Sequence, residues 1–330
     1  MYTLKGKLKN TRQRLKQISQ NKSYPTLVLI EETFYDLFSP LKFSICMCLM
    51  LVYPLIEIFA PVDLDFSAIS IHHAASFIAI VMTFPLFFWT FGIILTSIIG
   101  FFGSPLISEE INNGTMVILI SKPIKRYKIF LGKYIALLIF ALLLSFCTIF
   151  LLGWISVLRY SGNIFHFFGI SPFLFSVLLY AVVISLIFGS ITLALSSIFK
   201  NSRNPILVVV LFVVIPYIGF FFLRELIHFD YVDLQLYHFD LGYHLANVYV
   251  MFIELFNALP PSIGWQSTFA DVYSVYSYLG IVDADQNIVL GGLEKTNYYL
   301  PSISLLIWLI IAVLLLLYGI FSLQKREISS

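Results

Sequence analysis

The stretch FGSPLISEEINNGTMVILISKPIKRYKIFLGK, residues 102–133, is a long polar passage between two strongly apolar parts of the chain. It holds the acidic pair Glu109 and Glu110, then an Asn-Asn-Gly-Thr sequence, and it ends in a cluster of lysine and arginine residues. The segments on both sides are long and apolar enough to be helices in a lipid bilayer. We interpret this stretch as the part of a membrane protein that is held from the cytosol.

The composition of the chain is that of a membrane protein. Of its 330 residues, 59% are apolar and only 12% are charged, whereas soluble domains carry about 25% charged residues. The cysteines Cys46, Cys48 and Cys147 all fall inside apolar runs, which argues against a disulfide framework. The first 30 residues are basic but lack the apolar region of a cleavable signal peptide.

Long apolar segments predict an all-α membrane protein with six transmembrane helices. A span needs about 20 residues to cross about 30 Å of hydrocarbon, and in lipid a helix satisfies its own backbone polar groups. Pro85 and Pro216 fall inside two of these segments and predict kinks, because proline lacks a backbone donor. The predicted spans cover residues 42–60, 74–103, 131–158, 172–199, 205–223 and 302–323.

The residues before the first span divide into two parts. Residues 1–24 are predicted to be a basic cytoplasmic tail, solvated and held near anionic headgroups, because seven lysines and arginines occur there without an acidic residue. Residues 25–40 have apolar side chains at three-to-four spacing, which favours an amphipathic helix at the membrane surface. The remaining residues, 41–330, are predicted to form one six-span domain.

The distribution of lysine and arginine predicts the orientation in the membrane. Arg159 is the one lysine or arginine in the predicted outer loops at 61–73 and 159–171, whereas the termini and the 104–130 segment are rich in basic residues. Because basic residues accumulate on the cytoplasmic side, both termini and this segment are predicted to be cytoplasmic. The long loop at 224–301 is then outside, and we expect it to form a small extracellular cap between spans five and six.

A group of histidines and aspartates in that loop leaves two interpretations open. Imidazole and carboxylate groups bind zinc or copper, and Asp240 with His244 has the i, i+4 spacing of a helix face. The same residues also suit the polar side of an interfacial segment, with no metal bound. The candidate metal ligands are His228, His238, Asp240 and His244.

Three cytoplasmic segments resemble those of type-two ATP-binding-cassette (ABC) exporter permeases. The sequence LALSSIFKNSRNPILVVV, between spans four and five, is similar to one family segment. The sequence IEETFYDLFSPLKF resembles the family's elbow helix before the first span. The most informative match is the opening stretch, with Glu109-Glu110, Gly114-Thr115, the apolar patch Val117 to Ile120, Ser121-Lys122-Pro123, Arg126 and Leu131-Gly132-Lys133.

The resemblance implies that residues 104–128 are a coupling segment that docks on a separate ATPase subunit. Residues 105–117 would form a helix across the cytoplasmic face, with apolar side chains in a groove of the partner and charges at the rim. An ordinary polar loop between two spans is the alternative. The implied docking residues are Leu106, Ile107, Glu109, Glu110, Ile111, Gly114, Thr115, Met116, Pro123 and Arg126.

The chain lacks the motif that would let it bind ATP itself. Gly132-Lys133 is preceded by Tyr127 where a Walker A glycine would stand and followed by Tyr134 where Ser or Thr would stand. We therefore expect no cofactor and no enzyme activity on this chain, with ATP and Mg bound by an ABC ATP-binding subunit. One six-span chain is half of a pathway, so the resemblance also implies a second permease chain, identical or not.

The predicted setting is the cell membrane, with the lipid bilayer as partner and no nucleic acid. Two alternatives to an exporter permease remain: a polytopic membrane scaffold or metal-binding protein, and an ion-coupled secondary transporter. The spans contain no series of charged residues of the kind that proton-coupled transporters use, and Glu57 is the one acidic residue well inside a predicted span. The sequence does not identify the transported substrate.

Overall fold

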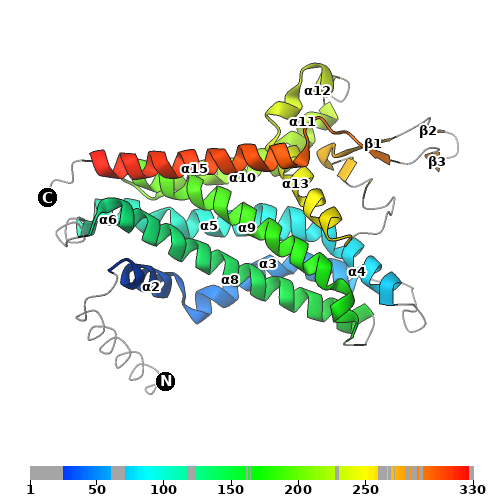
Figure 1. Cartoon of the computed structure of the whole chain (residues 1–330), viewed down its shortest axis with the longest axis horizontal. Coiled ribbons are helices and arrows are strands. Elements are labelled where there is room, and N and C mark those ends of the chain that lie inside the picture. The colour runs from blue at the N-terminus through cyan, green and yellow to red at the C-terminus, as the bar shows by residue number, and fades with distance from the viewer. Residues whose placement is uncertain are drawn as a thin grey trace.

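The protein is described by a computed structural model in which long helices form a bundle (Figure 1). The predicted basic tail, Pro123, His228 and the patch Val117 to Ile120 lie outside the described residues. The structure describes residues 25–60, 71–116, 124–160, 163, 165–226, 230–258, 266, 269–270, 272–278, 282–283, 288–289 and 293–326.

The first half of the chain supplies the segments that lead to and from the polar stretch. Leucine, isoleucine, phenylalanine and other apolar side chains dominate each long helix. One described segment of this half is π-helical, with wider turns than an α-helix. The elements are α2 (Pro25–Leu37), α3 (Pro40–Phe59), α4 (Ile71–Pro85), π-helical η2 (Leu86–Leu95), α5 (Thr96–Gly103), α6 (Pro105–Asn112) and α8 (Arg126–Tyr160).

The second half begins with the long helix that packs against most of the others. The elements are α9 (His166–Ile198), α10 (Arg203–Val214), π-helical η3 (Ile215–Gly219), α11 (Phe220–Leu226), α12 (Asp230–Asp233), 3₁₀-helical η4 (Leu236–His238), α13 (Leu241–Leu255) and α15 (Pro301–Lys325). Among the described residues between α13 and α15, four short strands are present.

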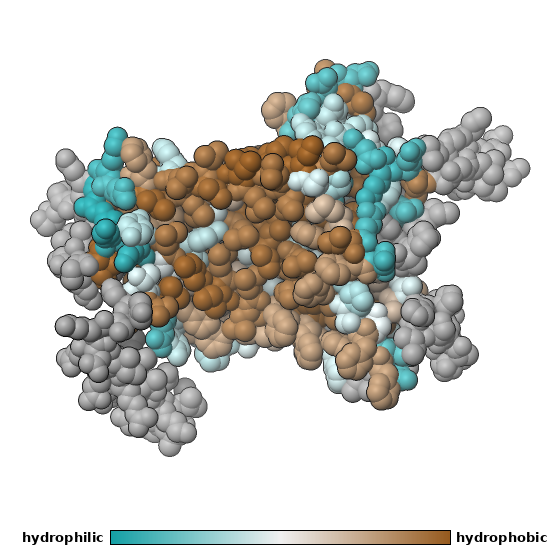
Figure 2. Space-filling model, viewed as in Figure 1, coloured by the Kyte–Doolittle hydropathy of each residue, from teal (hydrophilic) through white to brown (hydrophobic). Residues whose placement is uncertain are grey.

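Five helices in the described part of the chain are long and apolar enough to cross a bilayer. They are Pro40–Phe59, Ala75–Asn112, Arg126–Tyr160, His166–Ile198 and Pro301–Lys325. The predicted fifth span, at 205–223, is a shorter apolar helix, Arg203–Gly219, which α11 extends to Leu226. The apolar surface forms a broad belt with hydrophilic residues at both ends of the molecule (Figure 2), as a bilayer requires.

The two prolines that predicted kinks lie at π-helical segments. Pro85 is the residue directly before η2, and Pro216 is inside η3. Proline removes one backbone donor, and a π-helical turn shifts the following hydrogen bonds by one residue. The two segments lie against each other, because a Cβ added at Gly92 would be 2.7 Å from Cε1 of Tyr217.

An aromatic cluster around Phe87 joins four elements to Phe269 and Tyr273, which follow α13 in the chain. Its ring centroid lies 4.8–5.8 Å from those of Tyr180, Tyr217, Tyr249, Phe269 and Tyr273. All six side chains are buried. Aromatic contacts at such distances add about 0.5–1.5 kcal/mol per pair beyond area burial. The cluster therefore fixes η2, α9, η3 and α13 to one another.

The region of the predicted extracellular cap is not purely α-helical, so the all-α prediction is wrong there. Strand β1 (Tyr276–Tyr278) pairs antiparallel with β4 (Leu293–Lys295), and β2 (Val282–Asp283) with β3 (Ile288–Val289). Tyrosine and valine favour strands, and these segments are too short and polar to span a bilayer. The strands lie at the opposite end of the bundle from α6 (Figure 1).

Candidate functional site

The site predicted from the sequence, residues 104–128, begins with α6, which continues the second long helix at the end of the bundle. Ser104 keeps helical dihedral angles, φ −58° and ψ −42°, and Pro105 occupies the first turn of α6. The backbone N–H groups of Ile107 and Ser108 both donate to the Ser196 hydroxyl on α9, at 3.1 Å. That hydroxyl in turn donates to the Ser104 carbonyl at 2.6 Å. One serine of α9 thus caps the beginning of α6.

The Lys133 side chain of α8 holds the middle of α6. Its ammonium group donates to the Leu106 carbonyl at 2.5 Å and pairs with the Glu110 carboxylate at 2.5 Å. The lysine side chain is 3% exposed and that of Glu110 is 28% exposed. Because removing one partner of a buried ion pair leaves an uncompensated charge, this contact constrains α6 relative to α8.

The predicted docking residues divide into anchoring and exposed groups. Ile107 and Met116 are fully buried within this chain. Their predicted insertion into a groove of a partner does not fit this burial, and they hold the segment in place instead. Of the other predicted residues, Leu106, Glu110 and Ile111 are half-buried, and Glu109, Gly114 and Thr115 are exposed. Asn112 and Asn113, which were not among the predicted docking residues, are exposed as well.

The chain turns at Gly114, directly after α6. Gly114 has a positive φ of 71°, and a Cβ added there would meet nothing within 4 Å. The position therefore needs a residue that adopts the left-handed region, while its surroundings leave space for a side chain. The neighbouring Thr115 hydroxyl donates to the Glu110 carbonyl at 3.3 Å, which closes the turn.

Two arginines cap the neighbouring helix ends. Arg126 Nη1 donates to the carbonyls of Leu323, Gln324 and Arg326, at 2.9–3.1 Å, at the end of α15. Arg326 Nη1 donates to the Ser197 and Ile198 carbonyls, at 2.7 and 3.4 Å, at the end of α9. Cations at helix C-termini satisfy free carbonyls and complement the helix dipole. Arg126 thus has a structural contact in addition to any docking role.

The candidate metal ligands that the structure describes, His238, Asp240 and His244, have partners within the protein. Asp240 is the N-cap of α13, and its carboxylate accepts from the Tyr243 N–H at 3.0 Å and the Tyr231 hydroxyl at 2.9 Å. It also lies 3.2 Å from Nε of Arg224, and both side chains are buried. This ion pair ties the start of α13 to α11.

The histidines of the same group also form hydrogen bonds. His244 Nδ1 bonds with the Ser304 hydroxyl at 2.9 Å, and His238 Nδ1 with the Tyr299 hydroxyl. Burial lowers the pKa of His244, which favours the neutral imidazole. In the parts of the chain that the structure describes, no three histidine, cysteine or acidic side chains are grouped so as to hold a metal ion.

Sequence reasoning missed the residues that anchor α6. Ser196 lies near the end of the fourth predicted span, in the sequence LALSSIFKNSRNPILVVV that carried the resemblance. No spacing pattern in that sequence predicts that this serine caps another helix. Lys133 gave a better signal, because it is the one lysine or arginine inside the predicted span at residues 131–158. The Arg326 contact with α9 joins residues more than a hundred positions apart, so no local pattern could predict it.

Comparison with known proteins gives one result. A protein-family model described as "ABC-2 family transporter protein" matches residues 9–328, which is nearly the whole chain. A search of curated proteins found no match.

Proposed function

This chain belongs to the ABC-2 transporter family, and from that premise we propose that it is the permease subunit of an ATP-driven exporter. It forms half of a translocation pathway and receives force from a separate ATPase subunit through the 104–128 segment. ATP and Mg are bound by that partner. A second permease chain, identical or different, supplies the other half of the pathway. The chain lies in the cell membrane, and its 104–128 segment faces the cytosol.

The anchoring of α6 is the observation that carries this proposal. Its start is bonded to Ser196 of α9 and its middle to Lys133 of α8. A displacement of the exposed tip therefore acts on both long helices at once. Coupling of this kind needs a packed element with two arrangements that a ligand can distinguish, and helix shifts at interfaces are a known form of it.

The proposed docking surface consists of the exposed tip of α6 and the turn after it. Glu109 supplies a charge at the rim, and its carboxylate accepts from the Ser202 hydroxyl at 3.2 Å. Asn112, Asn113, Gly114 and Thr115 supply polar exposed backbone and side chains. Charges at the rim of an interface set specificity and association rate, so a reversed charge there disfavours the correct partner.

The test reverses the charge of Glu109 in the complete transporter. Glu109→Lys should reduce the amount of ATP-binding subunit that co-purifies in mild detergent several-fold, and should reduce ATP-driven transport in liposomes in parallel. The matched control is Asp233→Lys, the same charge change at an exposed residue of the opposite end. Equal co-purification and transport in both variants would remove α6 from the docking surface.

A further inference from the structure

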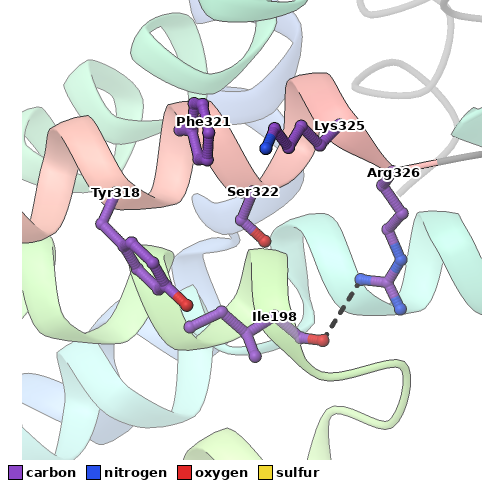
Figure 3. A pocket seen from close by; sticks show the side chains of 6 residues that line it. All are labelled: Ile198, Tyr318, Phe321, Ser322, Lys325 and Arg326. Atoms are coloured by element: carbon purple, nitrogen blue, oxygen red, sulfur yellow. Dashed lines mark hydrogen bonds between the residues drawn. The ribbon is translucent and has the colours of Figure 1, made fainter.

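An open hollow lies between the end of α9 and the last turns of α15 (Figure 3). Its volume is about 380 Å³, and its lining is Ile198, Tyr318, Phe321, Ser322, Lys325 and Arg326. Ile198 and the two aromatic side chains are exposed. Apolar side chains are also exposed along the preceding turns of α15, namely Leu306, Ile310, Val313, Leu314 and Leu317. The hollow is thus where the apolar surface of α15 gives way to polar residues.

The polar side of the hollow is positively charged. The Lys325 ammonium lies 4.4 Å from the ring centroid of Phe321. Within the described residues, no acidic side chain forms an ion pair with Lys325 or Arg326. Arg126 already donates to the free carbonyls at the end of α15. These carbonyls therefore do not need the Lys325 ammonium as a donor.

Arg326 can bind an anion without releasing α9. Both of its bonds to α9 carbonyls use Nη1, and a guanidinium group has further N–H donors on Nε and Nη2. The hydroxyl of Ser322 is 3.5 Å from the Ser197 carbonyl, at the same helix end. Figure 3 shows the Tyr318 and Ser322 oxygens pointing toward Ile198, between the two helices.

We propose that this hollow binds the headgroup of an anionic phospholipid. The phosphate lies between Lys325, Arg326 and the Ser322 hydroxyl, and an acyl chain runs along Tyr318 and Phe321 onto the apolar face of α15. Cations at the border of the apolar belt attract anionic lipids, and charged hydrogen bonds to phosphate are stronger than neutral ones. A choline headgroup adds a positive charge beside two cations, so phosphatidylcholine binds more weakly. The inference rests on membrane embedding and not on the export function.

The test compares lipid retention by the full-length chain. Protein reconstituted in nanodiscs of equal phosphatidylglycerol and phosphatidylcholine is transferred to mild detergent, and bound lipid is counted by native mass spectrometry. The wild-type chain should retain more phosphatidylglycerol than phosphatidylcholine. Lys325→Gln should lower this retention about five-fold, the size expected for one lysine at an anionic surface. Lys42→Gln, an exposed lysine at the first residues of α3, is the matched control and should retain as much as wild type.

Three outcomes would overturn the proposal. They are equal retention of the two lipids by wild type, equal loss in Lys325→Gln and Lys42→Gln, and displacement of the bound lipid by inorganic phosphate alone. The last result would assign the site to a free anion. A melting temperature of Lys325→Gln equal to that of wild type in lipid-free detergent shows that lost retention is not lost folding.

Discussion

At the scale of single residues, Lys133 determines how α6 is held. Lys133→Met should reduce the free energy of unfolding by about 3 kcal/mol, the low end for a broken buried pair, because Glu110 keeps some access to water. Adding Glu110→Gln should recover part of that loss, since the unpaired charge is removed. Thermal melts of the two single variants and the double variant in detergent measure the coupling. Additive effects would show that the two side chains do not interact.

The turn at Gly114 separates a backbone effect from a side-chain effect. Gly114→Pro cannot adopt a φ of 71°, since proline holds φ near −65°. We expect it to leave the bundle folded, because the residue is exposed, but to reduce ATP-driven transport strongly. Gly114→Asn is the control, because asparagine tolerates the left-handed region and open space surrounds the position. Equal transport in both variants would contradict a role for the turn geometry.

His244 predicts a pH dependence of stability. Its pKa in the folded protein is lowered by burial, so the unfolded chain binds more protons than the folded chain at acidic pH. The stability is present above the unfolded pKa of about 6.5 and is lost as the pH falls below it. The melting temperature of wild type in detergent should fall more from neutral pH to pH 5.5 than that of His244→Gln, which keeps a group able to bond Ser304. An equal fall in melting temperature for wild type and His244→Gln would contradict this role of His244.

At the scale of elements, the contact between η2 and η3 is a close approach that a methyl group would disrupt. A Cβ at Gly92 would lie 2.7 Å from Cε1 of Tyr217 and 2.8 Å from the Phe87 carbonyl oxygen. Gly92→Ala should therefore cost about 1–3 kcal/mol of unfolding free energy. Gly219→Ala, in the other π-helical segment, meets its nearest atoms at 3.9 Å and should be neutral or slightly stabilising. Thermal melts of both variants decide the matter, and equal melting temperatures would contradict the close packing.

Apolar segments and proline positions predicted most of the helices but not how their ends are joined. Hydrophobic length predicted α3, α8, α9 and α15 because a bilayer imposes it. Proline predicted where the helix geometry changes, but not that the result is π-helical. The residues that hold α6 act across the bundle, and such contacts depend on tertiary packing that no local spacing encodes. The burial of Ile107 and Met116 was missed for the same reason.

At the scale of the whole molecule, the predicted orientation gives a labelling test. Helix α2, α6 and the last turn of α15 lie at one end of the bundle, and the short strands lie at the other (Figure 1). In a chain whose Cys46, Cys48 and Cys147 are replaced, Asn113→Cys should react with a membrane-impermeant maleimide only after cells are opened. Ser277→Cys, in β1, should react in intact cells. The reverse pattern would invert the predicted topology.

The contact of Arg326 with α9 has a consequence for how the protein is made. Residues near position 326 leave the ribosome after the rest of the described helices, yet they close the end of α9 beside Ser196. The surface around α6 is therefore completed only after residue 326 has been synthesised. A chain that stops before α15 would leave the Ser197 and Ile198 carbonyls without the Arg326 donor, so this end of α9 would lack its cap.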